Sequence, residues 1–391
     1  MDESILYRAE KIILILIFGL SIYIPFIGGV IQEDKISSTF EKRNLTKLPS
    51  IPKSIKEFKQ FPEIFTLYYS DHFGLRETFT KAYFRLLNKL SDKSSVDDVT
   101  VGQDGWLFLG SIKPGYTKFN DPMGDAVNAN LFPEKELVTF ARSLMSVKNW
   151  LHNRGIEYVY IIAPNKHTIY SDKLPTYISK QNKESATDQL VSYLQEHTDI
   201  AVVDLRQVLK EEKKRHQAYF KTDTHWNHYG ANAAQFSIMN KIKTLFPEKI
   251  SPFLLNDSQF KILIKGGGDL AKFAKIENIK RECPQPVFEN ECIPVLEIIQ
   301  TNDKKRQPYT MVCEAKELTA VIFRDSFFSA LDPYISRYFH RSTYIWEKIN
   351  YNSLMKYVEQ EKPDIIIEEV IERSLPYIPS ASILEFTAKN E

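Results

Sequence analysis

Residues 319–326 read TAVIFRDS: an apolar run ends at Phe323, and Arg324, Asp325 and Ser326 follow it directly. Downstream, similar runs alternate with helix-like periodicity, in the order strand 319–323, helix 327–338, strand 343–346, helix 352–360 and strand 364–368. Such alternation is typical of a mainly parallel sheet covered by helices. We therefore expect an α/β fold in which Ser326 lies beyond the carboxyl end of a strand, where the sites of such sheets gather.

The upstream part of the chain continues this pattern. Helical periodicity predicts helices at 58–69, 76–90, 134–153, 183–197 and 229–246, and apolar runs predict strands at 156–163 and 201–204. A hairpin is expected where 99–101 and 106–109 flank Gly-Gln-Asp-Gly, because an Asp-Gly turn supplies positive φ angles. The signal is weaker between 247 and 310, which indicates loops or a small insertion.

A second stretch, residues 221–227, reads KTDTHWN and places a carboxylate two residues before an imidazole, just ahead of a helix-like run. A serine hydroxyl is a poor nucleophile near neutral pH until a base takes its proton. An imidazole does so when a carboxylate fixes its tautomer. We predict that Ser326 is the nucleophile, His225 the general base and Asp223 the carboxylate that orients it.

Each of these motifs also has a structural interpretation. Ser326 is an ordinary residue type for a helix N-cap, and Asp223 with His225 can be a hydrogen-bonded pair at a helix start. Asp223, His225 and His228 would suit zinc, but no distant Cys or His motif supplies a fourth ligand, so we expect no metal. Trp226 is a candidate for stacking on a sugar ring, with a place in the core as the alternative.

The composition names no partner by itself. Of 391 residues, 43% are hydrophobic and 26% are charged, enough for a sizeable core. The 51 basic and 50 acidic residues leave a net charge of +1. The chain therefore has no overall basic field that favours nucleic acid and no acidic bias that favours disorder.

Residues 12–31 carry no charged side chain. As a helix they reach about 30 Å, the thickness of the hydrocarbon layer of a membrane. A signal peptide is the competing interpretation, but its apolar part is shorter and ends at small residues, whereas Gln-Glu-Asp follows here. We expect a short tail at 1–11, a transmembrane anchor at 12–31, a polar linker at 32–55, a domain at 56–380 and a tail at 381–391. Counting flanking Lys and Arg residues does not decide the orientation of the anchor.

The three cysteines, Cys283, Cys292 and Cys313, are too few for a fold built on disulfides. Cys283 and Cys292 could form one local bridge in an oxidising compartment, leaving Cys313 over. Three unpaired thiols are the alternative.

Six short motifs lie along the chain in order. They are Asp71-His72-Phe73-Gly74-Leu75-Arg76, Gly105-Trp106-Leu107-Phe108, Pro164-Asn165-Lys166, Asp223-Thr224-His225-Trp226, Gly268-Asp269-Leu270 and Arg324-Asp325-Ser326-Phe327. This ordered set resembles the alginate O-acetyltransferase and DHHW-type family of SGNH-like proteins, over roughly residues 58–373. The chain reads Asp-Thr-His-Trp where the family name refers to Asp-His-His-Trp, which leaves the subfamily open.

The resemblance implies an SGNH-hydrolase-like fold with permuted strand order, so that the Asp-x-His element precedes the serine. It implies that Asp325 shapes the turn at the nucleophile and that the Ser326 backbone N–H helps to bind the oxyanion. Asn165 and Arg373 are further candidates for oxyanion binding. Trp226 and Arg324 are candidates for substrate contacts.

The activity implied by the resemblance is O-acetyl transfer to a polysaccharide through an acetyl-serine intermediate. The protein would be a single-pass protein of the cytoplasmic membrane, with its catalytic domain outside the cytoplasm. A membrane-bound O-acyltransferase would supply the acetyl group, and no cofactor is implied. Alginate, another exopolysaccharide, a secondary cell-wall polymer and peptidoglycan all fit as acceptors. The alternatives are an acetylesterase of the same fold and a noncatalytic polysaccharide-binding or scaffold protein.

Overall fold

The computed structural model describes parts of residues 11–44, and residues 46–75, 99–110, 121–276, 279–289, 292–298 and 306–376. The chain forms two compact units, Met1–Ser95 with Lys272–Ile276 and Val96–Ala271 with Glu277–Glu391. The helix expected at 76–90 and the tail at 381–391 lie outside the described residues, as do parts of the expected anchor and linker.

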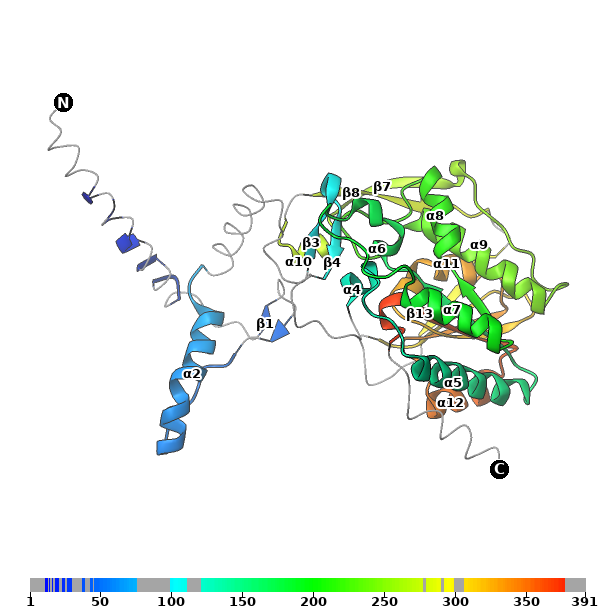
Figure 1. The fold of residues 1–391 in the computed structure, drawn as a ribbon, viewed down its shortest axis with the longest axis horizontal. Coiled ribbons are helices and arrows are strands. Elements are labelled where there is room, and N and C mark those ends of the chain that lie inside the picture. The colour runs from blue at the N-terminus through cyan, green and yellow to red at the C-terminus, as the bar shows by residue number, and fades with distance from the viewer. Residues whose placement is uncertain are drawn as a thin grey trace. The chain divides into compact units, whose positions relative to one another are not determined.

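In the first unit, α2 (Ile55–His72) confirms the helical spacing seen in the sequence from Phe58 onward (Figure 1). Its N-cap Ser54 accepts a hydrogen bond from the Glu57 backbone N–H at 3.2 Å, which satisfies one of the free N–H groups of the first turn. Among the residues that the structure describes, none of the helices combines the length and the apolar character that a membrane crossing requires.

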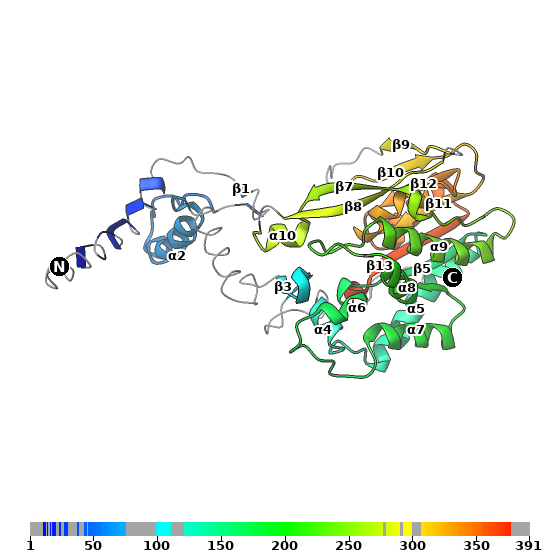
Figure 2. The ribbon, with the colours of Figure 1, turned by 90° about the horizontal axis from the view of Figure 1, so that it is seen from above.

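The second unit is built on a seven-stranded sheet in the order β6-β5-β13-β11-β12-β10-β9. Figure 2 labels its strands from β5 to β9. The strands are β5 (Glu157–Ala163), β6 (Ala201–Asp204), β9 (Val295–Ile298), β10 (Tyr309–Val312), β11 (Thr319–Phe323), β12 (Arg341–Ile345) and β13 (Ile365–Ile371). The strands from β6 to β12 are parallel, whereas β10 and β9 pair antiparallel at one edge. The sheet is therefore mixed but mainly parallel, as expected.

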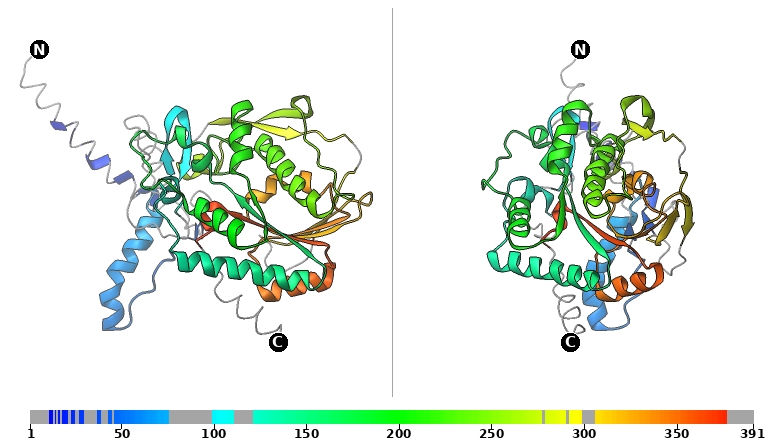
Figure 3. Two further views of the ribbon diagram at one scale, coloured as in Figure 1. Left: turned by 45° about the vertical axis from the view of Figure 1, so that its right-hand side comes forward. Right: turned by 90° about the vertical axis from the view of Figure 1, so that its right-hand side faces the viewer.

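Helices cover both faces of this sheet, as the end-on view in Figure 3 shows. Side chains alternate across each strand, so that Ile322 of β11 joins one buried cluster and its neighbour Val321 the other. The first cluster includes residues of α8 (Arg206–Arg215), α9 (His228–Leu245) and α11 (Asp332–Ile335). The second includes residues of α5 (Glu134–His152), α7 (Ala186–His197) and α12 (Tyr351–Glu361). Burial on both faces explains the continuous apolar runs of these strands.

The strand register leaves room for a loop at the carboxyl edge of the sheet. β5 and β13 end together, since Ala163 pairs with Ile371, but β11 stops at Phe323, which pairs with Glu368. Residues 369–371 of β13 therefore run on past the end of β11. The residues after β11 can hydrogen-bond to this free stretch of β13.

Two predicted elements differ from the structure. The expected helix 327–338 is a 3₁₀ turn (Phe327–Ala330) followed by the short α11, because Pro333 in the first turn starts a new helix rather than continuing the old one. The hairpin of β3 (Val99–Val101) and β4 (Leu107–Leu109) is present, with Asp104 at φ 55° and Gly105 at φ 76° in its turn. That turn confirms the expected positive φ angles.

The region 247–310 is more regular than predicted. It contains the antiparallel pair β7 (Phe260–Gly266) and β8 (Lys280–Pro286), α10 (Asp269–Phe273), and the edge strands β9 and β10. Most of β7 is exposed, so it lacks the apolar run of a buried strand. The prolines in β8 also argue against a strand when only the sequence is read.

The cysteine pairing differs from the one considered from sequence. Cys292 is bonded to Cys313, and Cys283 is a buried free thiol. Proximity in sequence favoured Cys283 with Cys292, but the edge strands bring Cys292 and Cys313 to a Cα separation of 6.0 Å. This separation is suitable for a disulfide.

Candidate active site

Ser326 lies in the turn that follows β11, at the carboxyl edge of the sheet. The preceding Asp325 fixes this turn: its Oδ1 accepts from the Phe327 N–H at 2.8 Å, and its Oδ2 accepts from the Ile371 N–H at 3.0 Å. The Asp325 N–H donates to Glu369 Oε2 at 3.0 Å. Burial and the Asp325 carboxylate raise the pKa of Glu369 well above its ordinary value. The free end of β13 therefore holds the serine turn.

Asp223 and His225 lie in a loop between α8 and α9, outside the strands of the sheet. An isolated β-bridge between Tyr219 and Trp226 closes this loop. Asn227 caps α9 by accepting from two backbone N–H groups of its first turn. The imidazole is therefore placed just before a helix start, as predicted.

The structure brings the three predicted catalytic residues together. His225 Nε2 lies 2.9 Å from Ser326 Oγ, and His225 Nδ1 lies 2.8 Å from Asp223 Oδ1. In the tautomer that this arrangement favours, the serine donates to Nε2 and Nδ1–H donates to the carboxylate. The side chains of His225 and Asp223 are 29% and 12% exposed. The base is thus reachable from solvent while its carboxylate is largely enclosed.

The second oxygen of Asp223 is also occupied. Oδ2 accepts from Arg281 of β8 and from the Asp269 N–H at 3.3 Å. Burial acts to raise the pKa of Asp223, but the hydrogen bond and charge of His225, together with Arg281, outweigh it and hold this pKa well below its ordinary value. Asp223 therefore remains an anion that can stabilise an imidazolium.

Gly268 and Asp269 pack directly against the same loop. The Gly268 N–H donates to Thr222 Oγ1 at 3.2 Å, and Asp269 Oδ1 accepts from the Thr224 N–H at 2.7 Å. A Cβ atom on Gly268 would lie 2.4 Å from the Asp223 Cβ. Only glycine allows this close approach.

Asn165 follows β5 and Arg373 follows β13, which lies between β5 and β11 in the sheet. Arg373 Nη1 donates to Asn165 Oδ1 at 3.2 Å, and Asn165 Nδ2 donates to Asp125 Oδ2 at 3.2 Å. The Arg373 guanidinium lies 5.4 Å from the ring of Phe327, which packs against His225 with ring centres 4.8 Å apart. Burial lowers the pKa of Arg373. Arg373 is therefore linked to the triad through Phe327, and Asn165 through its hydrogen bond to Arg373.

Trp226 and Arg324, the two candidates for substrate contacts, are both buried in this structure. Trp226 is 1% exposed and packs edge-on against Phe327, so it supports the site from the core. Arg324 is 6% exposed, and its Nη2 donates to the Tyr309 hydroxyl at 3.1 Å.

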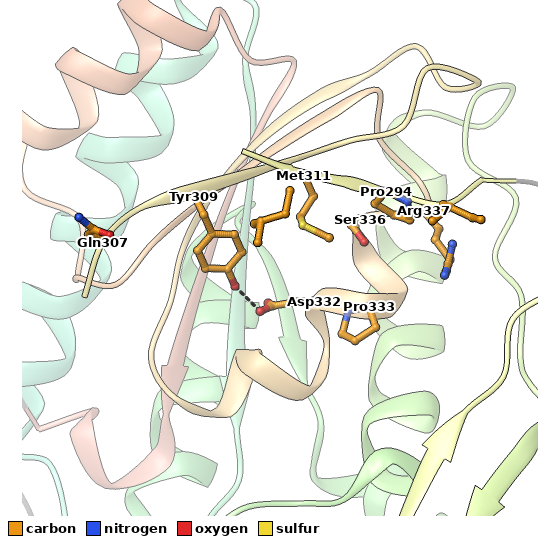
Figure 4. A pocket seen from close by; sticks show the side chains of 10 residues that line it. Pro294, Gln307, Tyr309, Met311, Asp332, Pro333, Ser336 and Arg337 are labelled. Atoms are coloured by element: carbon orange, nitrogen blue, oxygen red, sulfur yellow. Dashed lines mark hydrogen bonds between the residues drawn. The ribbon is translucent and has the colours of Figure 1, made fainter. Parts of the chain in front are cut away.

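The Arg324 contact leads to a cavity of about 580 Å³ between β10 and α11 (Figure 4). Tyr309 and Met311 line it from β10, and Asp332 and Pro333 line it from α11. The Tyr309 hydroxyl donates to Asp332, and burial raises the pKa of Asp332 to about 6. Neither the triad residues nor Arg324 line this cavity, and Arg324 is connected to it only through the hydroxyl of the lining residue Tyr309.

A metal site is not favoured by the donor set. Asp223, His225 and Asp269 offer ligand atoms within 4.8 Å of one another, whereas His228, which the sequence suggested, does not join them. Asp223 is already paired with Arg281, and Asp269 Oδ1 accepts two backbone N–H groups. A guanidinium beside the carboxylate takes the place of a cation, so the arrangement fits a Ser-His-Asp triad better.

No role was predicted from sequence for Arg281, Asp269 or Lys166. All three contact the loop that carries Asp223 and His225, which we call the triad loop. Asp269 and Lys166 did occur in the motifs that carried the resemblance. Arg281 had no signal, because its partner lies 58 positions earlier and Arg281 itself falls in the stretch 247–310 that was expected to form loops or a small insertion.

With this geometry in place, comparisons with known proteins become informative. The family model for the SGNH hydrolase-like domain, acetyltransferase AlgX, matches residues 99–295, about half of the chain. This match includes Asp223 and His225 and ends before Ser326. Among curated proteins, a probable alginate O-acetylase AlgJ of Pseudomonas putida is 23% identical over 234 residues. Those residues are 57% of this chain and 51% of the relative, so the match spans about half of the relative's length.

Solved structures resemble the chain more widely. A DHHW family protein from Eubacterium siraeum aligns with a TM-score of 0.51 and 13% identity, covering 75% of this chain and 97% of that protein. PatB1 of Bacillus cereus aligns with a TM-score of 0.48 and 16% identity, covering 72% of this chain and 99% of that chain. The first of these shows a shared fold. From the family match and the SGNH-like α/β architecture, we conclude that the chain belongs to the family of SGNH hydrolase-like domains of the acetyltransferase AlgX type.

Proposed function

We propose that this protein is a serine-dependent O-acetyltransferase that moves acetyl groups onto hydroxyls of a polysaccharide. The observation that carries the proposal is the continuous hydrogen-bonded line from Ser326 through His225 to Asp223 in a member of this family. The family match does not reach Ser326, so the role of this serine rests on its geometry.

In the first step, His225 Nε2 takes the proton of Ser326 as the serine oxygen attacks the carbonyl carbon of an acetyl ester. A bond forms between Oγ and the acetyl carbon, and the donor leaves with the proton that His225 returns. Asp223 stabilises the imidazolium that exists between these events. The Ser326 backbone N–H stabilises the oxyanion, with Arg373 and Asn165 as further candidates.

In the second step, His225 takes a proton from a sugar hydroxyl, whose oxygen attacks the acetyl-serine. The acetyl group passes to the sugar, and Ser326 regains its proton. Water can replace the sugar in the same step. Because the His225 side chain is 29% exposed, water reaches the base, which makes acetylesterase the second candidate activity.

For the setting of this reaction we propose a single-pass protein of the cytoplasmic membrane with its catalytic domain outside the cytoplasm. The uncharged stretch 12–31 supports an anchor, and the Cys292–Cys313 disulfide fits an oxidising compartment. A membrane-bound O-acyltransferase is the proposed source of acetyl groups. The curated relative is named for alginate, and for this chain we propose only a polysaccharide acceptor.

The test is intact mass of the full chain after incubation with p-nitrophenyl acetate. We expect an adduct of about 42 Da on Ser326, absent in Ser326→Ala and slow to form in His225→Ala. Ser329→Ala is the matched control, because Ser329 is an exposed serine in the same 3₁₀ turn. A folded chain with neither adduct nor ester turnover would overturn the proposal. Adding candidate glycans then separates transfer from release of free acetate.

A further inference from the structure

Lys166 is a buried cation that touches the triad loop but has no part in the chemistry described above. It follows β5 at the start of α6 (Lys166–Ile169) and is 2% exposed. Its Nζ donates to three backbone carbonyls of the loop: those of Phe220 at 3.2 Å, Lys221 at 3.2 Å and Asp223 at 2.7 Å. An ammonium has three N–H donors, and the loop offers three acceptors.

Two aromatic rings also lie near this ammonium. The rings of Trp106 and Phe108, in and beside β4, lie 5.7 Å and 5.3 Å from Nζ. The β3–β4 hairpin also contacts the loop directly, since the Leu107 N–H donates to the Lys221 carbonyl at 2.9 Å. Lys166 therefore fills a space that the hairpin, α6 and the triad loop enclose.

Three carbonyl oxygens that converge on one point repel one another unless a donor lies between them. Leaving a buried carbonyl unpaired is unfavourable, because the group loses its hydrogen bond to water and gains none in the protein. The Asp223 carbonyl belongs to the residue that orients His225, so a shift of this carbonyl moves the carboxylate and the imidazole together. A displacement of about 1 Å in a catalytic group is enough to lower a rate by about 10²-fold.

We propose that Lys166 is a positioning residue whose protonated ammonium holds the Asp223–His225 loop in the conformation in which His225 reaches Ser326, and that loss of its proton releases this loop. The inference rests on the proposed function of the triad. A neutral amine has only two N–H donors and turns its lone pair toward the third carbonyl, so deprotonation replaces one of the three hydrogen bonds with a repulsive contact.

The electrostatics place this event in an accessible pH range. Burial lowers the pKa of Lys166 to about 7, although the carboxylates of Asp269 and Asp223 oppose the shift. His167, beside it on α6, does not titrate in this range, because burial and the charges of Lys166 and Arg373 lower its pKa to about 3. The fraction of protonated Lys166, and with it the productive loop conformation, falls as pH rises through about 7.

Stability should change in the opposite direction. Unfolding restores the ordinary pKa of lysine, so between pH 7 and about pH 10 the unfolded chain binds more protons at this position than the folded chain. The contribution of Lys166 to the free energy of unfolding therefore rises with pH over this range, while activity falls. If Lys166 had only a structural role, activity and the free energy of unfolding would change in the same direction as pH rises.

The experiment measures acylation of Ser326 in the full chain by p-nitrophenyl acetate from about pH 5.5 to about pH 9.5, with thermal melting at each pH. We expect the wild-type rate to pass through a maximum and to fall on the alkaline side while the melting temperature does not fall. Lys166→Met should be at least about tenfold slower at the wild-type optimum and should lack the alkaline fall. Lys166→Arg keeps a cation and should recover part of the rate without that fall.

Lys213→Met is the matched control, because Lys213 also donates to a carbonyl of α6, that of Ile169, but does not touch the triad loop. A folded Lys166→Met variant with the wild-type rate or the wild-type alkaline fall would overturn the proposal. If neither Lys166 variant folds, the wild-type data decide: rate and melting temperature falling together over this range would also overturn it.

A second readout does not depend on acylation. In ¹H NMR, the His225 Nδ1–H proton bonded to Asp223 should be seen in the wild type below pH 7 and weaken as Lys166 loses its proton. If Ser326 is not acylated but this signal weakens as Lys166 loses its proton, the positioning role of Lys166 stands and the proposed function fails. A signal that is unchanged between about pH 5.5 and about pH 9.5, and also unchanged in Lys166→Met, contradicts the positioning role of Lys166.

Discussion

The two halves of the candidate site are held in different ways. Ser326, Arg373 and Asn165 follow three neighbouring parallel strands, β11, β13 and β5, whose positions are fixed by the sheet ladder and by two buried clusters. Asp223 and His225 lie on a loop outside the sheet. That loop is held mainly by polar contacts from other segments, namely α6, β4, β8, Gly268 and the start of α10.

This difference separates stability from activity. Residues on the strand ends are supported by many neighbours, so their positions change only when the core changes. The loop depends on a few contacts, each of which can be removed without disturbing the core. Substitutions in the supports of the loop should therefore lower activity far more than they lower stability.

Removal of the base is the strongest test of this separation. His225→Ala leaves Ser326 without a proton acceptor, and we expect acylation of Ser326 to fall by about 10³-fold or more, because triad members act as a unit. The melting temperature should be nearly unchanged, since His225 is not part of the core. His197→Ala, at an exposed histidine on α7, serves as the control. Retention of more than about a tenth of the wild-type rate would contradict the assigned role.

Gly268→Ala should have the next largest effect. The added Cβ would lie 2.4 Å from the Asp223 Cβ and 2.5 Å from the Thr222 carbonyl oxygen, so the triad loop must move. We expect acylation to fall by about 10²-fold, with a smaller loss of stability. Gly266→Ala is a close control, because nothing lies within 4 Å of a Cβ at that position. Equal rates in the two variants would show that the loop tolerates displacement.

Arg281→Met should have a smaller, pH-dependent effect. Arg281 helps to hold the pKa of Asp223 below its ordinary value, so its removal raises that pKa. A carboxylate whose pKa is depressed in the folded protein contributes to the free energy of unfolding at pH values above its ordinary pKa. It loses this contribution as pH falls. The acid limb of the pH–rate profile should therefore move to higher pH, with a loss of about tenfold at neutral pH. Arg281→Lys should show a smaller shift, and an unmoved acid limb in Arg281→Met would rule out the ion pair as a determinant.

The strands of the seven-stranded sheet and the helices packed on it were largely predictable from sequence. β11 and β6 have the predicted bounds, and β5, α5 and α9 differ from prediction by about one residue at an end. These elements bury their side chains, so apolar runs and helical periodicity report them directly. The serine turn and the Asp-x-His spacing were visible because both are local in sequence.

The contacts that hold the triad loop were not predictable from sequence, because they join residues that lie far apart in the chain. Arg281 acts on Asp223 across 58 positions, from a strand whose neighbours on β7 are mostly exposed and give no periodic signal. The role of Trp226 could not be decided from sequence, because an aromatic residue beside a catalytic histidine can face either substrate or core, and only packing decides which. Contacts of this kind depend on tertiary structure rather than on local pattern.

The disulfide gives the smallest expected effect on activity. Cys313 follows β10, whose Val312 pairs with Arg341 at the amino end of β12, and Arg341 in turn pairs with Thr319 at the start of β11. The disulfide therefore lies at the edge of the sheet opposite to Ser326. Closing a loop of 21 residues, it should contribute about 3 kcal/mol to the free energy of unfolding.

We therefore expect Cys313→Ser to lower the denaturant midpoint while the acylation rate of the folded protein stays within about twofold of wild type. Cys283→Ser, at the buried free thiol, controls for replacing a buried cysteine without breaking a bridge. A rate that falls in step with stability in Cys313→Ser alone would mean that the two edges of the sheet are coupled. The position of Ser326 would then depend on the edge strands β9 and β10 as well as on β13. In that case the serine, like His225, would depend on contacts far from the strand end that carries it.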